Sequence, residues 1–156
     1  MNALPSSLQA ELAAQLGEGW VTGPSERLAY GYDNSRPQSV PDAMRFAGPA
    51  VEVDDHDPAR PAQRVPVIAR GRGTNTTGAA VPVAGGVVVS FERMNRIVDI
   101  RPGDRCAVVE PGVLNGDLQS ALKPHGLFWP PDPTSAGYST VGGNLACNAG
   151  RPRAVK

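Results

Sequence analysis

The sequence predicts an α+β fold in which a small parallel, βαβ-like part is followed by antiparallel strands and short helices. Three observations favour this class. The apolar runs are short, at residues 65–70, 87–91, 97–100 and 106–110. Leucines spaced every four residues predict helices of only two or three turns. The 156 residues include 18 glycines and 16 prolines, a composition that interrupts long helices.

The first expected element is an amphipathic helix over residues 6–17. Leucines recur at every fourth position from residue 8 to residue 16, and Gly17 follows them as a stop signal. Ser6 and Gln9 have the spacing of a capping box, which predicts how the helix begins. A polar stretch over residues 20–36 then leads to a possible strand at Asp42–Ala47.

The runs at residues 97–100 and 106–110 are expected to form a hairpin. They flank Pro102-Gly103, which suits the two central positions of a type II turn. Leucines at positions 114, 118 and 122 predict a second short helix, with Asn115 near its start and Pro124 just past its end. From Trp129 onward, the proline and glycine content predicts a loop.

Composition excludes several classes of function. The 15 basic residues balance 15 acidic ones, so electrostatics gives no reason to expect nucleic acid or an anionic membrane as a partner. Cys106 and Cys147 lack metal-binding spacing and are too few for a disulfide framework. The chain shows neither a signal peptide pattern nor an apolar run of membrane length, so we expect a cytoplasmic protein.

A glycine-rich loop is the sharpest feature of the sequence. It reads Gly71-Arg-Gly-Thr-Asn-Thr-Thr-Gly78 and directly follows the expected strand Val65–Arg70. Three glycines let backbone N–H groups approach a ligand, and successive exposed N–H groups form an anion nest suited to a pyrophosphate. A tight turn without a ligand explains such a loop equally well when the loop is considered alone.

Two common phosphate loops do not fit this segment. A P-loop requires Gly-Lys-Ser/Thr at its end, whereas Gly78 is followed by two alanines. A Rossmann fingerprint requires a crossover helix after the glycines, and Pro82, Gly85 and Gly86 leave no room for one. If the loop binds phosphate, it does so within another architecture.

Five motifs in order resemble the vanillyl-alcohol-oxidase-type FAD-binding domain. The motifs are Arg70-Gly-Arg-Gly-Thr-Asn-Thr-Thr-Gly-Ala-Ala-Val-Pro82, Glu92-Arg-Met-Asn-Arg-Ile-Val-Asp-Ile100, Val109-Glu-Pro-Gly-Val113, Pro130-Pro-Asp-Pro-Thr134 and Thr140-Val-Gly-Gly-Asn-Leu-Ala-Cys-Asn-Ala-Gly150. Within that superfamily, the chain is most similar to the branch of the glycolate oxidase D-subunit and D-lactate dehydrogenase. The similarity is strong over residues 65–156 and weak over residues 6–40.

The resemblance implies a set of residues that bind FAD. The first loop would wrap the pyrophosphate, the second segment would turn beside the cofactor, and the last two would line the pyrophosphate and the isoalloxazine. No histidine lies in the loop, so the FAD should be held non-covalently. The expected cofactor-binding residues are Arg70, Gly71, Arg72, Gly73, Thr74, Asn75, Thr76, Thr77, Gly78, Pro111, Gly112, Val113, Pro131, Asp132, Thr140, Val141, Gly142, Gly143 and Asn144.

The resemblance also implies an activity, the oxidation of a 2-hydroxy acid such as glycolate or D-lactate by hydride transfer to FAD. Two alternatives to this activity stay open. In the first, the chain is a catalytically inactive gene remnant. In the second, it is a flavin-binding subunit that needs a partner chain. A third and weaker reading is the enolpyruvyl-sugar reductase branch, which shares the fold. We assign no residue as catalytic and none as a metal ligand.

The sequence departs from the family pattern in three places. Residues 47–64 hold three prolines and an acidic cluster where the family has an amphipathic helix, so Gly48–Gln63 is expected to lack a regular helix. Arg151 stands where the family favours glycine, and the sequence ends at Lys156, within a motif. We therefore expect residues 1–156 to be a truncated FAD-binding domain, with its flavin-binding core at 65–156 and without the substrate-binding cap.

Overall fold

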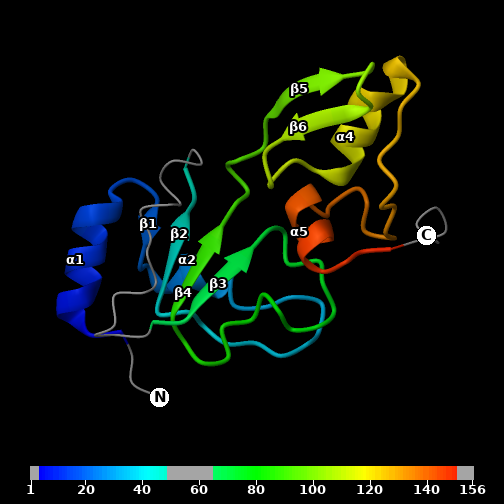
Figure 1. Ribbon diagram of the computed structural model, residues 1–156. Helices are drawn as coiled ribbons and strands as arrows, with labels where there is room; N and C mark the ends of the chain where they lie inside the picture. The colour runs from blue at the N-terminus through cyan, green and yellow to red at the C-terminus, as the bar shows by residue number, and fades with distance from the viewer. Residues whose placement is uncertain (1–3, 49–64, 151–156) are drawn as a thin grey trace.

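The computed structural model describes residues 4–48 and 65–150 and confirms the α+β class (Figure 1). We refer to residues 4–48 and 65–94 as the sheet unit, because they hold a four-stranded sheet. Residues 95–150, the hairpin unit, hold a two-stranded antiparallel pair and two of the helices. The last helix, α5 (Val141–Ala146), lies between the sheet and the hairpin in Figure 1.

The sheet unit is built on three parallel strands. The strand order is β1-β2-β4-β3, and the bounds are β1 (Trp20–Val21), β2 (Ala43–Phe46), β4 (Val87–Ser90) and β3 (Val67–Arg70). Met44 and Val88 have no exposed surface, so the two central strands hold the core of this unit. Ser90 is in register with both Phe46 and Arg70, and the three parallel strands therefore end at one edge. The loops that leave this edge form the candidate site.

Helix α1 (Ser6–Leu16) confirms the helix expected at residues 6–17. Gly17 ends it with φ 55°, and the Gly17 amide donates to the Ala13 carbonyl at 3.1 Å. The predicted capping box is wrong, because Pro5 occupies the N-cap and no side chain caps the helix. The Gln9 side chain donates instead to the carbonyl of Leu4 at 3.1 Å.

Two short elements in the polar stretch 20–36 were not predicted. One is the two-residue strand β1, which is too short to show a pattern of alternation. The other is α2 (Pro24–Leu28), in which proline occupies the first turn. Proline is common at this position because its missing N–H has no helical partner there. The signal was present, but five residues are too few for apolar periodicity to reveal a helix.

The connections between the parallel strands agree with the sequence as far as they are described. Residues 71–86, between β3 and β4, form turns and bends without a helix. This confirms that the loop is not part of a Rossmann unit. Of the interval Gly48–Gln63, all but Gly48 lies outside the described residues, and so does the crossover of the expected βαβ-like part.

The hairpin unit confirms the predicted hairpin and the second helix. β5 (Ile97–Arg101) pairs with β6 (Cys106–Val109), α4 spans Asn115–Leu122, and the 3-10 turn η1 (Lys123–His125) follows. The buried core of this unit comprises Val113, Leu118, Leu122 and Val141. Ile97, Ile100, Ala107, Val109, Leu127 and Trp129 pack against it. One face of the hairpin therefore lies on α4 and α5.

The predicted type II turn of this hairpin is wrong. A type II turn needs positive φ at Gly103, whereas the left-handed residue of the described loop is Arg105, with φ 54°. Four residues, 102–105, connect the strands, and the Asp104 amide donates to the Arg101 carbonyl at 3.2 Å. A Pro-Gly pair suits several turns, and the length of the loop decided which one formed.

Candidate functional site

The loop at residues 71–78 leaves the carboxyl end of β3, as the sequence predicts. Gly73 and Gly78 have φ of 64° and 79°, values that L-residues rarely adopt. Among residues 71–78, only the Thr77 amide donates to a group in the described chain, the Asn75 side-chain oxygen at 3.1 Å. The other amides of the loop have no partner among residues 4–48 and 65–150, which fits an anion nest.

Arg70 lies beneath this loop rather than in it. Its side chain is buried, its Nη1 donates to the Tyr32 carbonyl at 2.6 Å, and its guanidinium lies 5.5 Å from the Tyr30 ring. Burial lowers the pKa of Arg70. A Cβ atom on Gly73 would lie 2.7 Å from the guanidinium carbon. Arg70 therefore supports the loop from inside, with its guanidinium bonded to backbone carbonyls of segment 29–36.

Segment 29–36 holds the other side of the loop, and the sequence analysis missed its role. The Asn34 amide donates to the Asn75 carbonyl at 3.0 Å. Buried Asp33 accepts from the Ser35 amide at 2.8 Å and from the Ala80 amide at 3.4 Å. Asp-x-Ser is a known turn signature that could have suggested this local turn. Its contact with Ala80, 47 residues away, has no signal in the sequence.

The electrostatics of Asp33 are those of a structural carboxylate. Burial raises its pKa, but hydrogen bonds from the Ser35 hydroxyl and amide and from the Ala80 amide outweigh burial. The pKa of Asp33 is therefore lowered, and the carboxylate is charged at neutral pH. A buried, charged acceptor of this kind fixes the two segments that it joins.

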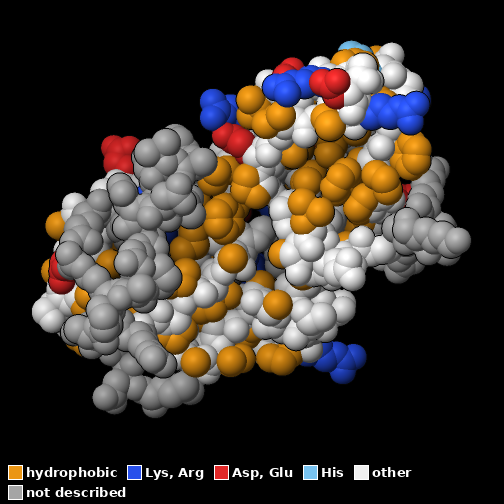
Figure 2. Space-filling view, viewed as in Figure 1, with side chains coloured by type: hydrophobic (Ala, Val, Ile, Leu, Met, Phe, Trp, Pro, Cys, Tyr) orange, Lys and Arg blue, Asp and Glu red, His pale blue; other side chains and the backbone are white. Residues whose placement is uncertain are grey.

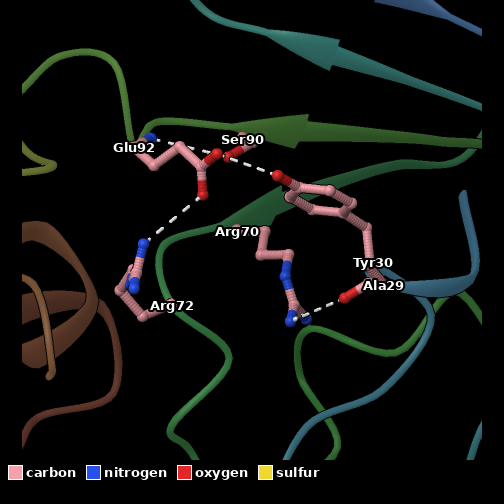
Figure 3. A network of polar contacts seen from close by, with 6 residues as sticks. All are labelled: Ala29, Tyr30, Arg70, Arg72, Ser90 and Glu92. Carbon is pink, nitrogen blue, oxygen red and sulfur yellow. Dashed lines mark hydrogen bonds and ion pairs between the residues drawn. The ribbon is translucent and has the colours of Figure 1, made fainter. Parts of the chain in front are cut away.

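A chain of polar contacts links the ends of β3 and β4 (Figure 3). The Tyr30 hydroxyl donates to Glu92 Oε1 at 2.8 Å, and Arg72 Nη1 lies 3.8 Å from Glu92 Oε2. Burial and the bonded carboxylate raise the pKa of Tyr30 to about 12, so its hydroxyl stays protonated at neutral pH. The Arg72 side chain is half exposed, in contrast to that of Arg70.

The second predicted segment, Pro111-Gly112-Val113, runs back against the sheet unit. The Gly112 amide donates to the Met94 carbonyl at 2.7 Å. A Cβ atom on Gly112 would overlap the Phe91 carbonyl oxygen and lie 2.7 Å from that of Met94. Gly112 is therefore required where the two units meet. Val113 is buried in the core of the hairpin unit.

The third predicted segment, residues 140–144, lies in the first turn of α5 and not in a loop. Thr140 caps the helix, and its side-chain oxygen accepts from the Gly143 amide at 3.2 Å. The missing Cβ of Gly142 faces Pro111, whose carbonyl oxygen would lie 2.9 Å away. The prediction of a loop from Trp129 onward is wrong here, because tertiary packing against Pro111 favours a helix that two glycines disfavour.

The structure brings three of the predicted segments together. The Val141 amide donates to the Val113 carbonyl at 2.8 Å, so residues 140–142 lie alongside residues 111–114. A Cβ atom on Gly71 would meet the Thr140 side chain, so the first loop lies against the start of α5. The glycine-rich loop, segment 111–113 and segment 140–144 thus form one region at the junction of the two units.

Pro131 and Asp132 are half-buried in the loop that follows η1. Within residues 4–48 and 65–150, neither makes a hydrogen bond or an ion pair with the loop 71–78. The Gln119 side chain holds this segment by bonding the backbone of Trp129, accepting from its amide at 3.1 Å and donating to its carbonyl. The contact of Pro131 and Asp132 with the cofactor stays a prediction.

Asn144 has a buried partner that the sequence analysis did not select. Its side-chain amide donates to the Asn115 side-chain oxygen at 2.9 Å. In the described part of the chain, Asn115 Nδ2 and the Ser139 hydroxyl are buried without a hydrogen-bond partner. Buried polar atoms are usually hydrogen-bonded, so each of these two atoms retains the capacity to bond a water or a ligand atom.

The residues present fit a diphosphate-containing cofactor better than a metal ion. Within the described residues, the amides of the loop other than that of Thr77 have no hydrogen-bond partner, which is the donor set that a phosphate group requires. No group of three His, Cys, Asp or Glu side chains in the described residues could hold a metal. Of the described helices, none has both the length and the apolar character needed to cross a membrane.

These features define a class, an α+β domain in which a glycine-rich loop joins two parallel strands without a helix. Residues 59–156 match the family described as FAD binding domain. The chain belongs to this family of FAD-binding domains, and FAD is its cofactor. The match confirms the resemblance to the vanillyl-alcohol-oxidase-type FAD-binding domain that five motifs of the sequence indicated.

Curated relatives point to one branch of that family. The chain is 40% identical over 131 residues to "Glycolate oxidase subunit GlcD" of Bacillus subtilis, covering 83% of this chain and 28% of the relative. It is 41% identical over 93 residues to "D-lactate dehydrogenase" of Anaerostipes hadrus, covering 60% of this chain and 19% of the relative. The chain thus spans less than a third of the length of either protein.

A solved structure supports the fold. An alkyldihydroxyacetonephosphate synthase matches with a TM-score of 0.78 at 24% identity, over 92% of this chain and 29% of that one. At this identity the match concerns the fold alone. The arrangement of the sheet unit, the hairpin unit and α5 is therefore that of a known fold.

Proposed function

We propose that this chain binds FAD non-covalently through the loop 71–78, with segments 111–113 and 140–144 completing the cradle. The observation that supports this most is the set of unbonded amides in a loop that lies at the carboxyl end of a parallel strand. Arg70 and Asp33 hold the loop from two sides, so the amides are oriented before a ligand arrives. Such preorganisation lowers the entropic cost of binding.

We further propose that the activity served by this domain is the oxidation of a 2-hydroxy acid such as glycolate or D-lactate. The names of the two relatives supply the substrate class. A bound flavin supplies the acceptor for the hydride removed from the substrate. The described residues supply binding and orientation, and none of them is assigned as a catalytic acid or base.

The second part of the proposal is that the exposed apolar side chains of this domain are covered by a partner chain or by further residues of the same protein. Apolar side chains are gathered on the surface of both units in Figure 2. On the hairpin, Val98 is 60% exposed and Val108 is 44% exposed, on the face opposite to α4. Exposed apolar side chains on a face that no helix covers favour contact with another layer of protein.

Titration of FAD with the purified chain tests the binding function. Quenching of the flavin fluorescence reports the affinity of the wild type and of Gly73→Val. We expect the variant to lose most of its affinity, because valine resists positive φ and its Cβ displaces Arg70. Gly103→Val is the matched control, since no atom lies within 4 Å of a Cβ at this position.

Thermal unfolding of both variants separates a lost site from a lost fold. A folded Gly73→Val chain with undiminished FAD affinity would rule out the loop as the phosphate site. If the wild type itself fails to bind FAD, the described residues do not form a sufficient cradle, and the proposal for this chain fails.

A further inference from the structure

Arg70 and Arg72 flank Gly71, the first residue of the loop 71–78, and the structure gives the two arginines different roles. Arg70 is buried and donates to the carbonyls of Ala29 and Tyr32, at 3.5 and 2.6 Å. Arg72 is half exposed, and within the described chain it forms an ion pair with Glu92. Arg72 is also the single charged residue of the loop 71–78. Of these two arginines, Arg72 is therefore the one that a bound anion can reach.

The ion pair of Arg72 is loose compared with the others in the described chain. Arg72 Nη1 and Glu92 Oε2 are 3.8 Å apart, whereas Arg96 and Glu110 approach to 2.7 Å. At 3.8 Å the two groups attract each other without a good hydrogen bond. Half-exposed pairs of this kind contribute little free energy, so a better anion can replace the carboxylate.

Glu92 does not depend on Arg72 for its position. Its second carboxylate oxygen accepts from the Tyr30 hydroxyl at 2.8 Å, and its side chain is 27% exposed. Figure 3 shows Glu92 between Tyr30 on one side and Arg72 on the other. If Arg72 moves to another anion, the Tyr30 hydroxyl still holds the carboxylate.

We propose that Arg72 is a phosphate-contacting residue of this site, and that Glu92 positions its guanidinium in the free protein and yields it to a bound diphosphate. This inference rests on the proposed binding of FAD at the loop 71–78. The backbone amides select a diphosphate by geometry, and Arg72 adds a charge that recognises it bidentately. Glu92 lowers the affinity, because its carboxylate competes with the phosphates for the same cation.

A double-mutant cycle with Arg72→Met and Glu92→Gln tests this exchange, with the FAD affinity of the full chain as the readout. Arg72→Met should weaken binding about tenfold or more, since a charge-assisted hydrogen bond is lost. Arg72→Lys should retain part of the affinity, because it keeps the charge but not the fork. Glu92→Gln keeps an acceptor for Tyr30 and should tighten binding about two- to fivefold.

The effect of Glu92→Gln must depend on Arg72. In the Arg72→Met background, we expect it to change the affinity for FAD by much less than in the wild type. Arg101→Met is the matched control, because Arg101 is also exposed and paired, with Asp99 at 2.6 Å, but lies on the hairpin. It should leave the affinity unchanged. Raised salt should weaken FAD binding to the wild type more than to Arg72→Met.

Each outcome decides the inference. An Arg72→Met affinity within twofold of the wild type overturns it, and so does an equal effect of Glu92→Gln in both backgrounds. In either case FAD binding through the loop amides stands. Failure of the wild type to bind FAD refutes the proposed function itself, and the role of Arg72 falls with it.

Discussion

Asp33 connects segment 29–36 to Ala80, just past the loop 71–78, and Asp33→Asn should weaken that connection. One carboxylate oxygen accepts from the Ser35 amide and hydroxyl, and the other accepts from the Ala80 amide at 3.4 Å. Asparagine keeps one carbonyl oxygen for Ser35. Its NH₂ group replaces the second oxygen and faces the Ala80 N–H, so two donors meet and neither has an acceptor.

The cost follows from these contacts. A hydrogen bond to a charged group contributes about 1.5–3 kcal/mol, and the long bond to Ala80 belongs at the lower end of that range. The bonds from Ser35 also weaken, because their acceptor loses its charge. Asp33 is only 5% exposed, so water compensates little of the loss. We expect Asp33→Asn to lower the free energy of unfolding by about 2 kcal/mol.

The same residue predicts a dependence on pH. The pKa of Asp33 is lowered from its ordinary value of 3.8, so the folded chain binds this proton less readily than the unfolded chain. The stabilisation is fully present above pH 3.8 and is lost as the pH falls through the lower, folded pKa. Asp33→Asn removes this contribution, so the difference between wild type and variant should shrink in acid.

Urea unfolding at neutral pH and in steps below pH 4 measures both effects. Asp104→Asn is the control, because Asp104 is exposed in the hairpin loop. Equal stability of Asp33→Asn and wild type at neutral pH would refute the assignment of a structural role to Asp33. A constant difference down to the lowest pH would refute the lowered pKa as its cause.

Two further outcomes are expected. Gly112→Ala should destabilise the chain by about 1–3 kcal/mol in the same unfolding assay, because its Cβ overlaps the Phe91 carbonyl oxygen. Gly103→Ala is the control and should leave the stability unchanged, because no atom lies within 4 Å of its Cβ. Equal stability of Gly112→Ala and the wild type would contradict the packing argument. The chain alone, supplied with FAD and a dye acceptor, should not oxidise glycolate or D-lactate, because the sequence assigns it no catalytic base; turnover above that of a heat-inactivated sample would show this prediction to be wrong.

The sequence predicted those parts of the fold that short-range patterns encode. The loop 71–78 was found because three glycines and four small polar residues follow an apolar run without interruption. The hairpin was found because two apolar runs flank Pro102-Gly103, and α4 was found because its leucines recur every four residues. Such features arise within a few residues of one another, so no knowledge of distant contacts was needed.

Helix α5 shows where that reasoning stops. Gly142 and Gly143 disfavour a helix, and the sequence analysis therefore placed them in a loop that allows a ligand to approach. In the structure, the missing Cβ of Gly142 makes room for Pro111, 31 positions earlier in the chain, and so lets the helix pack there. Gly142 does permit a close approach, but the group that approaches it in the structure is Pro111 of the same chain.

The polar contacts that support the candidate site also join residues far apart in the sequence, so short-range patterns could not predict them. The contact of Tyr30 with Glu92 joins residues 62 positions apart, and that of Arg70 with the Tyr32 carbonyl joins residues 38 apart. The glycines of the loop permit many conformations, and a flexible loop alone would lose much of its binding free energy on ordering. Arg70 and Asp33, outside the loop, select one conformation in which the amides are left unbonded. The loop sequence therefore makes phosphate binding possible, whereas the distant polar anchors determine how well the site is formed.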